Sequence, residues 1–317
     1  MRRADPDLAP VQTLVDGIFP RTARSVVERV EEGVSTRVYR IHRGDERFYL
    51  RVLPEAGASF APEVLAHALL RERGVNVPEV VHFEGYNDTL GRSVMVTTEI
   101  RGRPVGRRGV DGDPRHILVE AGRQLAVINS IPVAGFGWIR RGGDTITHTH
   151  LAAEHPTHRA FVGEHLEADL ALLARRVLSG REIAAVREVI DHHGAWLDAE
   201  RAWLAHGDFD ATHIFERDGR YSGIIDFGEI RGGDRWYDLG HFRMHDGETL
   251  PVLALPWLLE GYGAVAPLPA DHPGRIAFAS LLIAIRALAR ALRKRPRDIR
   301  RHQGWVAIRR DIALLRA

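Results

Sequence analysis

Strand-forming and helix-forming segments are segregated along this chain of 317 residues, and the separation limits the folds that are open to it. Short runs rich in β-branched and aromatic residues, separated by turn residues, occupy roughly the first hundred positions. From residue 116 onward, longer segments with apolar residues at helical spacing dominate. Strands followed by helices, instead of a regular alternation of the two, indicate an α+β protein with a sheet part and a helical part.

The first part is predicted to be an antiparallel sheet with one inserted helix. A short helix at about residues 8–15 precedes the sheet, and the inserted helix spans about 60–73 and ends at Gly74, a residue type that commonly caps helices. The predicted strands lie at about 25–31, 38–42, 47–53, 78–83 and 93–99.

The second part is predicted to be mainly helical. A change in composition near Arg101–Pro104 predicts a boundary that gives an N-lobe of residues 1–101 and a C-lobe of residues 102–317. A β-rich block, Trp203–Phe227, interrupts the helices and carries the most unusual residues of the chain. The predicted helices lie at about 115–131, 155–179, 182–200, 249–262, 272–292 and 298–315.

Composition argues against several kinds of partner. The 44 basic and 42 acidic residues nearly balance, and the basic run Ala289–Arg301 is typical of a solvated helix face, so no nucleic acid partner is expected. The absence of cysteine excludes disulfides and thiolate zinc sites. The N-terminus lacks an apolar signal-peptide core, and the longest apolar stretch, Ile276–Ile285, is too short to span a bilayer. We therefore expect a cytoplasmic monomer without a membrane partner.

Two aspartates in the β-rich block suit phosphoryl transfer. That reaction needs one carboxylate to orient and deprotonate the attacking hydroxyl, and separate ligands to hold a divalent metal against the phosphates. Asp208 suits the first role, and Asp226, which follows an apolar strand and precedes Phe227-Gly228, suits the second because hard cations prefer carboxylate oxygen.

The block resembles the catalytic region of kinase-like phosphotransferases, the family of aminoglycoside phosphotransferases and choline kinases. His206-Gly-Asp208 matches the family's H-G-D loop, and Asp226 stands 18 residues after Asp208 (226 − 208). The segment from Gly232 to Gly240 is similar to the G-D-P-x-x-D-L-A segment. The resemblance covers most of the chain and implies a bilobal protein-kinase-like fold, Asp208 as general base, Asp226 on Mg²⁺, and His206 and Asp238 as supports of the loop.

His213 departs from the usual asparagine of this loop. Macrolide phosphotransferases and one aminoglycoside branch are similar in carrying H-G-D-x-x-x-x-H, and this similarity implies that His213 is a second metal ligand. The alternative is a structural histidine, because imidazole is a less natural ligand for Mg²⁺.

Arg51 occupies the strand position where kinases place a phosphate-contacting lysine. Its guanidinium can bridge phosphate oxygens, and L-R-V or L-R-I also occurs in hygromycin-type and macrolide-type relatives. Glu63, in the helix that follows, matches the acid that pairs with this base.

Two further segments resemble nucleotide-binding elements of the family. Gly33–Tyr39 is similar to the shortened phosphate loop, which implies that Ser35 and Thr36 lie near the phosphates. Val94–Gly102 is similar to the hinge that binds the purine, which implies contacts at Thr98 and Ile100.

The resemblance implies a Mg²⁺-dependent kinase that uses ATP or GTP to phosphorylate a hydroxyl of a small molecule. An aminoglycoside-type antibiotic is the first choice of acceptor, which would make the protein a resistance enzyme. A macrolide phosphorylated at its 2′-hydroxyl and a metabolic alcohol are the alternatives. Acids that could receive a polycation lie within the insert at about 148–200, namely Glu154, Glu164, Glu167, Asp169 and Glu182.

Two readings from other classes are weaker. A non-haem iron site could use His206, Asp208 and His213, but a facial triad takes its second histidine from a distant strand. A catalytically silent nucleotide-binding module would explain the arginine and histidine replacements, but it has no chemical need for both aspartates at this spacing.

Overall fold

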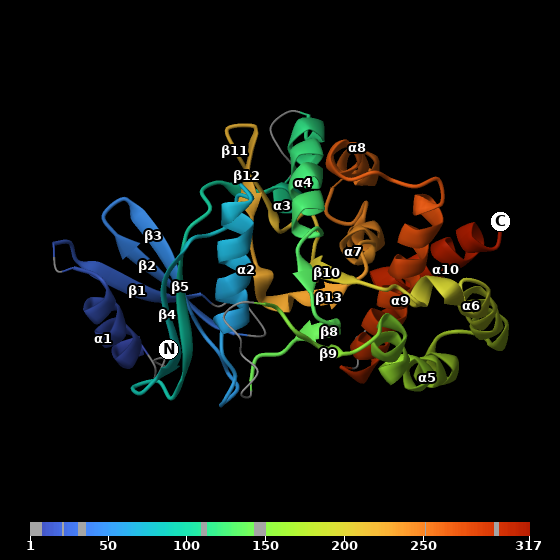
Figure 1. The fold of residues 1–317 in the computed structure, drawn as a ribbon, viewed down its shortest axis with the longest axis horizontal. Coiled ribbons are helices and arrows are strands. Elements are labelled where there is room, and N and C mark those ends of the chain that lie inside the picture. Colours follow the sequence, from blue (N-terminus) through green and yellow to red (C-terminus); the bar gives the residue numbers. More distant parts are fainter. Residues whose placement is uncertain are drawn as a thin grey trace. The chain divides into compact units, whose positions relative to one another are not determined.

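The computed structural model describes residues 8–20, 22–30, 36–108, 113–142, 150–250, 252–294 and 298–317. The chain divides into two compact units (Figure 1). The sheet unit comprises Met1–Arg101 and Arg140–Leu151, and the helical unit comprises Gly102–Ile139 and Ala152–Ala317. The segment Arg140–Leu151 thus groups with the sheet, although it lies between two parts of the helical unit in sequence.

The sheet unit contains the predicted N-terminal antiparallel sheet. Its five strands are ordered β1-β2-β3-β5-β4, and each neighbouring pair is antiparallel. In the register of the central strands, Arg51 lies opposite Val38 on one side and Met95 on the other. The strands are β1 (Ser25–Val30), β2 (Arg37–Arg43), β3 (Glu46–Val52), β4 (Val80–Asn87) and β5 (Arg92–Thr98).

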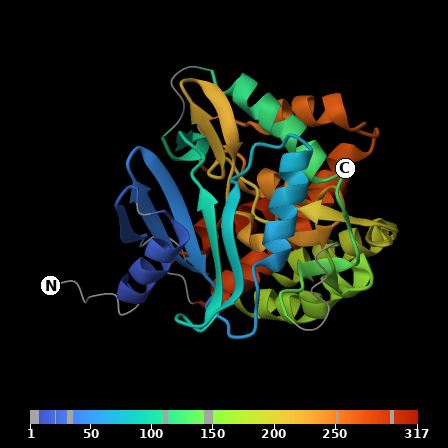
Figure 2. The ribbon, with the colours of Figure 1, turned by 60° about the vertical axis from the view of Figure 1, so that its left-hand side comes forward.

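Two helices, α1 (Leu8–Ile18) and α2 (Ala61–Glu72), lie on opposite faces of this sheet (Figure 2). Side chains alternate between the two faces of a strand, so Leu50 and Val52 pack with Val11 and Val15 of α1. Arg51, between them, therefore points to the face that α2 covers. The sequence alternation of β3 is what brings Arg51 to the same side as the helix that carries Glu63.

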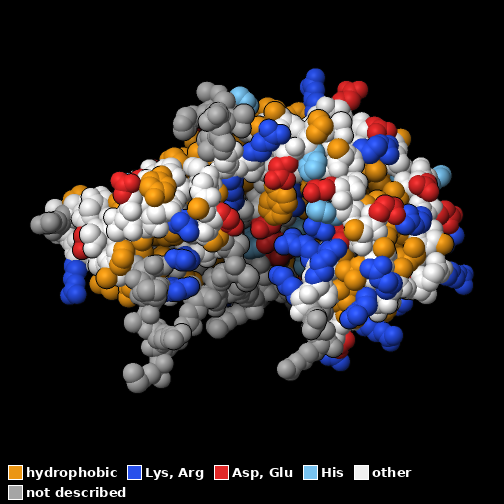
Figure 3. All heavy atoms as spheres, turned by 90° about the horizontal axis from the view of Figure 1, so that it is seen from below, with side chains coloured by type: hydrophobic (Ala, Val, Ile, Leu, Met, Phe, Trp, Pro, Cys, Tyr) orange, Lys and Arg blue, Asp and Glu red, His pale blue; other side chains and the backbone are white. Residues whose placement is uncertain are grey.

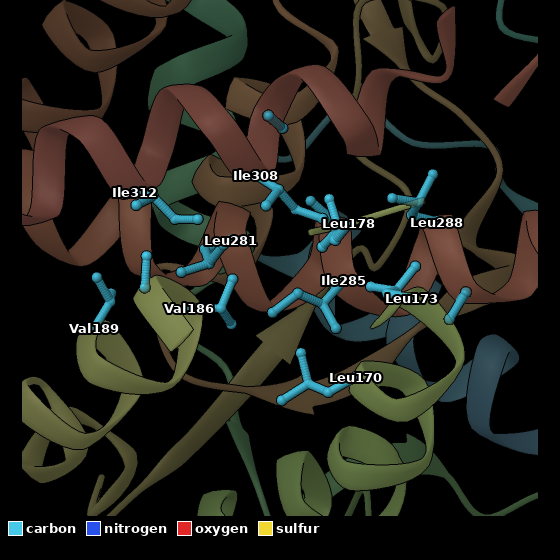
Figure 4. Packing of buried hydrophobic residues seen from close by; sticks show 14 of the residues in the cluster. Leu170, Leu173, Leu178, Val186, Val189, Leu281, Ile285, Leu288, Ile308 and Ile312 are labelled. Atoms are coloured by element: carbon cyan, nitrogen blue, oxygen red, sulfur yellow. The ribbon is translucent and has the colours of Figure 1, made fainter. Parts of the chain in front are cut away.

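The helical unit is built around α9 (His272–Arg293), which packs against α5, α7 and α10. Its buried core includes Leu173 of α5, Val186 of α6, Leu281 and Ile285 of α9 and Ile308 of α10 (Figure 4). None of the helices in the described part of the chain is long and apolar enough to cross a membrane. The other helices are α3 (Val105–Arg108), α4 (Arg115–Ile128), α5 (His158–Arg176), α6 (Gly180–His192), α7 (Tyr237–His245), α8 (Leu255–Val265) and α10 (Gln303–Leu315).

Several helix boundaries differ from the predicted ones for identifiable reasons. The helix predicted at 249–262 begins only at Leu255, because proline occupies its first turn and fixes the start there. The helix predicted at 182–200 ends at His192, and a separate 3₁₀ turn, Gly194–Leu197, follows. The start of α5 is fixed by Thr157, whose side chain accepts a hydrogen bond from the backbone N–H of Ala160.

Short strands inside the helical unit position the two aspartates. One sheet is ordered β7-β10-β13-β8-β9 and a second β12-β11-β6. The loop 206–213 joins β10 to β11, and Asp226 follows β12. Because Ile214 of β11 pairs with Ile224 of β12, the end of the loop and Asp226 lie next to each other. These strands are β6 (Arg103–Pro104), β7 (Pro132–Val133), β8 (Phe136–Ile139), β9 (Ala153–His155), β10 (Ala202–Ala205), β11 (Ile214–Arg217), β12 (Arg220–Ile224) and β13 (Arg231–Gly233).

Candidate active site

Asp238 anchors the loop that presents Asp208. This carboxylate, in the first turn of α7, is fully buried and accepts hydrogen bonds from the backbone N–H groups of His206 and Gly207, both at 2.9 Å. Asn129 also donates to it at 2.9 Å and to the carbonyl of Leu204 at 3.0 Å. Asn129 was not among the residues expected at the site. Its side chain bonds both Asp238 and the strand that leads into the loop.

Gly207 allows the sharp turn that precedes Asp208. Its φ of +90° lies in the left-handed region, and a Cβ atom there would stand 1.9 Å from the carbonyl oxygen of Glu229. No side chain fits between these two backbone segments. The turn leaves the side chain of Asp208 44% exposed, as a group that must meet a substrate requires.

His206 ties the loop to the end of β12. Its Nε2 lies 2.8 Å from the carbonyl oxygen of Ile225 and therefore donates, while Nδ1 accepts from the backbone N–H of Asp208 at 3.3 Å. Burial, together with the nearby charge of His213, lowers the pKa of this imidazole and favours its neutral form. Both nitrogens are engaged inside the protein, so His206 is not available for the iron site that it was considered for.

His241 of α7 contacts Asp208 directly. Its Nε2 lies 3.2 Å from Oδ1 of Asp208, and its Nδ1 lies 3.1 Å from the carbonyl oxygen of Phe209. Both neighbours are acceptors, so the ring donates to both only when it is an imidazolium. Partial burial raises the pKa of Asp208, but the hydrogen bond and charge of His241, with smaller effects of His213 and His206, hold it well below its usual range.

His213 and Asp226 lie side by side. The carbonyl oxygen of Asp208 is 2.7 Å from Nδ1 of His213, which places the proton on Nδ1 and leaves the Nε2 lone pair open. Nε2 is 3.8 Å from Oδ2 of Asp226. Asp226 has a φ of +66°, and its side chain is 55% exposed. Across the described residues, no group of three or more His, Asp or Glu side chains gathers in a metal-binding arrangement.

Arg51 and Glu63 form an ion pair in the sheet unit, with Nη1 of Arg51 at 2.5 Å from Oε2 of Glu63. Arg141, from the segment Arg140–Leu151, binds the other oxygen of Glu63 at 2.5 Å. Glu63 is fully buried, and the Arg51 guanidinium lies over the ring of Phe60 at 5.2 Å. Two guanidinium groups thus share one carboxylate. Arg141 was not expected, because it lies 78 residues from Glu63 in sequence.

The other predicted nucleotide contacts are placed as follows. Ser35 lies outside the described residues, and Thr36 is half-buried just before β2. Thr98 ends β5, and its backbone N–H donates to the carbonyl of Glu79 at 2.9 Å. Ile100 is half-buried and follows β5 by two positions.

Comparisons with known proteins identify the family and the fold. The model of the phosphotransferase enzyme family matches residues 26–278. A segment of 53 residues is 38% identical to an aminoglycoside 3′-phosphotransferase of Enterococcus faecalis; it covers 17% of this chain and only 20% of that enzyme. The fold is similar to that of aminoglycoside phosphotransferase APH(4)-Ia in complex with ADP and hygromycin B, with a TM-score of 0.65 and 18% identity over 96% of this chain and 98% of that one. A macrolide 2′-phosphotransferase of type I gives a TM-score of 0.59 with 16% identity over 99% of both chains.

The fold is therefore the predicted α+β, protein-kinase-like fold, with an antiparallel sheet unit and a larger, mainly helical unit. The chain belongs to the phosphotransferase enzyme family, whose model matches most of its length.

Proposed function

We propose that this protein transfers the γ-phosphoryl group of ATP or GTP to a hydroxyl of a small molecule, with Asp208 as the general base. The observation that carries this proposal is the setting of Asp208: a half-exposed carboxylate, on a loop braced by Asp238 and kept ionised by His241. A carboxylate with these properties can orient a hydroxyl and receive its proton.

The reaction then balances at named atoms. The acceptor oxygen forms a bond to the γ-phosphorus, the bond from that phosphorus to the bridging oxygen of the β-phosphate breaks, and the nucleoside diphosphate leaves. The hydroxyl proton passes to Asp208 and then to solvent. Positioning and charge stabilisation account for most of the rate enhancement in reactions of this kind.

The donor atoms of His213 and Asp226 fit a divalent cation such as Mg²⁺. A carboxylate oxygen and an imidazole lone pair supply two protein ligands, and phosphate oxygens and water complete the shell of such ions in kinases. A bound cation would neutralise charge on the β- and γ-phosphates. Asp226 and His213 hold it in this proposal, while Asp208 stays free for the acceptor.

The nucleotide is proposed to bind to residues 1–101, which belong to the sheet unit. Arg51 contacts its phosphates, and Glu63 orients Arg51. Arg141 doubles the positive charge at this carboxylate and is added as a second phosphate contact. The phosphate loop with Ser35 and Thr36 and the hinge at Thr98 and Ile100 complete the proposed nucleotide site.

For the acceptor, residues 102–317 are proposed to supply the site. An aminoglycoside-type antibiotic remains a candidate, with resistance by modification as its biological consequence, and the alternatives are a macrolide 2′-hydroxyl and a metabolic alcohol. These classes differ most in net positive charge and in apolar area.

An acceptor panel tests the proposed function. The protein is expressed in a sensitive bacterium, inhibitory concentrations are measured for antibiotics of both classes, and compounds that lose potency are assayed in vitro with ATP, GTP and Mg²⁺. Metabolic alcohols are assayed directly. A silent nucleotide-binding module would bind nucleotide but show no Mg²⁺-dependent turnover with any compound, and that result would overturn the proposal.

A further inference from the structure

The helical unit contains a cavity of about 380 Å³ between β8, α5, β13 and α9. Aromatic and aliphatic side chains form one part of its walls, and several of them also pack against the core of the unit. They include Trp138 of β8, Phe161 and Leu166 of α5, and Phe278, Leu282 and Ile283 of α9. Apart from Phe278, these side chains are only partly buried, so they leave apolar surface facing the cavity.

The cavity adjoins the loop that carries Asp208. Arg231 and Tyr237 line it, and the Arg231 guanidinium stacks on the Trp138 ring at 4.2 Å and donates to the Tyr237 hydroxyl at 2.7 Å. A Cβ on Gly207 would lie 2.8 Å from Nε of Arg231, so this wall of the cavity touches the residue that precedes Asp208. This end of the cavity therefore borders the loop that carries Asp208, although Asp208 is not among the residues that line it.

Four carboxylates line the cavity, those of Glu154, Glu164, Asp169 and Asp234, and Asp169 among them has cationic partners. Asp169 is buried and binds Arg286 at 3.1 Å and Arg293 at 2.6 Å. Glu164 lies 3.2 Å from Nε2 of His155. Burial raises the pKa of Asp234, which favours its neutral form.

Two of the acids that the sequence suggested as ligands for a polycation also form ion pairs with arginines on the outside of the helical unit. Glu167 binds Arg187 at 2.7 Å, and Glu182 binds Arg309 at 2.5 Å. Positive and negative side chains are interspersed with hydrophobic ones on the face of the larger unit seen in Figure 3. At the cavity itself, Arg286 and the exposed Arg290 add positive charge to the lining. A polycation would have to displace Arg286 and Arg293 to reach Asp169.

We propose that the acceptor is an amphiphilic alcohol with a broad apolar face and at most one cationic group, bound in the cavity between α5 and α9, and not a polycationic aminosugar. This inference rests on the proposed function, because it names the substrate class of the same reaction. The apolar face packs on the α5 and α9 side chains, and the reacting hydroxyl lies at the Arg231 and Tyr237 end, next to the loop that carries Asp208.

The test compares a macrolide, as the amphiphilic probe, with hygromycin B, as the polycationic probe. Product is detected by mass spectrometry as the gain of one phosphate, and kcat and KM are measured for the wild type, Leu282→Gln and Leu282→Met. Leu282→Gln places an amide against the apolar face of the acceptor and should raise KM for the macrolide about tenfold. Leu282→Met keeps the wall apolar and should change KM by less than about twofold.

The outcomes separate this inference from the proposed function. Phosphorylation of the macrolide with the Leu282→Gln effect supports both. Efficient phosphorylation of hygromycin B that is insensitive to Leu282→Gln, with little turnover of the macrolide, leaves the kinase function intact and overturns the inference. Failure to bind or phosphorylate any amphiphilic alcohol, while Asp208-dependent nucleotide hydrolysis persists, also overturns it. Nucleotide turnover that does not depend on Asp208 contradicts the proposed function itself.

Discussion

His241 of α7 contacts Asp208 of the loop 206–213, with 3.2 Å between Nε2 and Oδ1. The second nitrogen of His241 is fixed by the carbonyl of Phe209, so the ring cannot turn away without losing a buried hydrogen bond. The contact places an imidazole N–H donor beside the proposed base, from a helix that also carries Asp238. One helix thus sets both the backbone of the loop and the charge of its aspartate.

Replacing His241 by Gln should shift the acid limb of the pH profile of kcat/KM to higher pH. Gln can keep the hydrogen bond, which is the largest lowering influence on the pKa of Asp208, but it carries no charge; the pKa therefore loses the lowering due to the charge of His241 and rises. As pH falls, Asp208 is then protonated earlier and can no longer accept the hydroxyl proton. His192→Gln, at an exposed position on α6, is the control. An acid limb that stays in place in the His241 variant would show that the pair does not tune Asp208.

Gly207→Ala should abolish turnover, whereas Gly219→Ala should not. Both glycines have positive φ, +90° and +73°, and each substitution strains the backbone by about 1 kcal/mol. Only at Gly207 does the new methyl group collide with backbone, the carbonyl of Glu229, while Gly219 has nothing within 4 Å. Steady-state rates and denaturant unfolding are measured for both variants. They distinguish the backbone strain, which both variants share, from the collision, which only Gly207→Ala introduces. Equal activity of the two would mean that the loop tolerates displacement.

Arg51→Gln should weaken nucleotide binding about tenfold, because a charge-assisted hydrogen bond to phosphate contributes about 1.5–3 kcal/mol. Isothermal titration with a non-hydrolysable ATP analogue measures the effect. Arg47→Gln, on the same strand with a side chain that is 54% exposed, is the matched control. Arg141→Gln should weaken binding in the same direction. If neither Arg51 nor Arg141 affects nucleotide affinity, the shared carboxylate of Glu63 has only a structural role.

Leu281→Ala should lower the free energy of unfolding by about 2–5 kcal/mol, as is typical when a large buried side chain leaves a cavity. Leu281 is fully buried in the cluster of Figure 4, between the helices that pack on α9. Leu253→Ala, at a side chain that is 68% exposed, should change stability by less than about 0.5 kcal/mol. Chemical denaturation measures both. Similar values for the two variants would contradict the placement of the core.

The sheet unit and most long helices could be predicted from the sequence because their patterns are local. Strand alternation and apolar helical spacing can be recognised within a few residues, and the structure contains the strands and most of the helices that they predict. Helix α7 has no such pattern: the consecutive residues Asp238, Leu239 and Gly240 are all buried, although they point to different sides of it, so no polar face marks it as amphipathic. A helix buried all round does not show the alternation of polar and apolar faces that periodicity detects.

The residues of the candidate site likewise fall into two groups, those that a local motif could predict and those that only the folded structure brings to the site. Asp208, Asp226, Arg51 and Glu63 could be proposed from spacing and resemblance, because their motifs are contiguous or nearly so. His241 and Asn129 act through contacts made only after folding, since each meets the catalytic loop from a separate helix or its end. Arg141 is likewise brought to Glu63 by a segment that returns to the sheet unit. No local pattern marks such residues in a single sequence.

Turnover by Asp208→Asn, compared with Asp218→Asn, tests the central claim most directly. Asp218 lies in the exposed turn between β11 and β12, with 89% of its side chain accessible, and receives the same chemical change away from the loop. With any acceptor that the wild type phosphorylates, Asp208→Asn should lower kcat by at least about a hundredfold while nucleotide affinity stays within about twofold. Asp218→Asn should leave both unchanged. Full kcat in the Asp208 variant would contradict the account of Asp208 as the base.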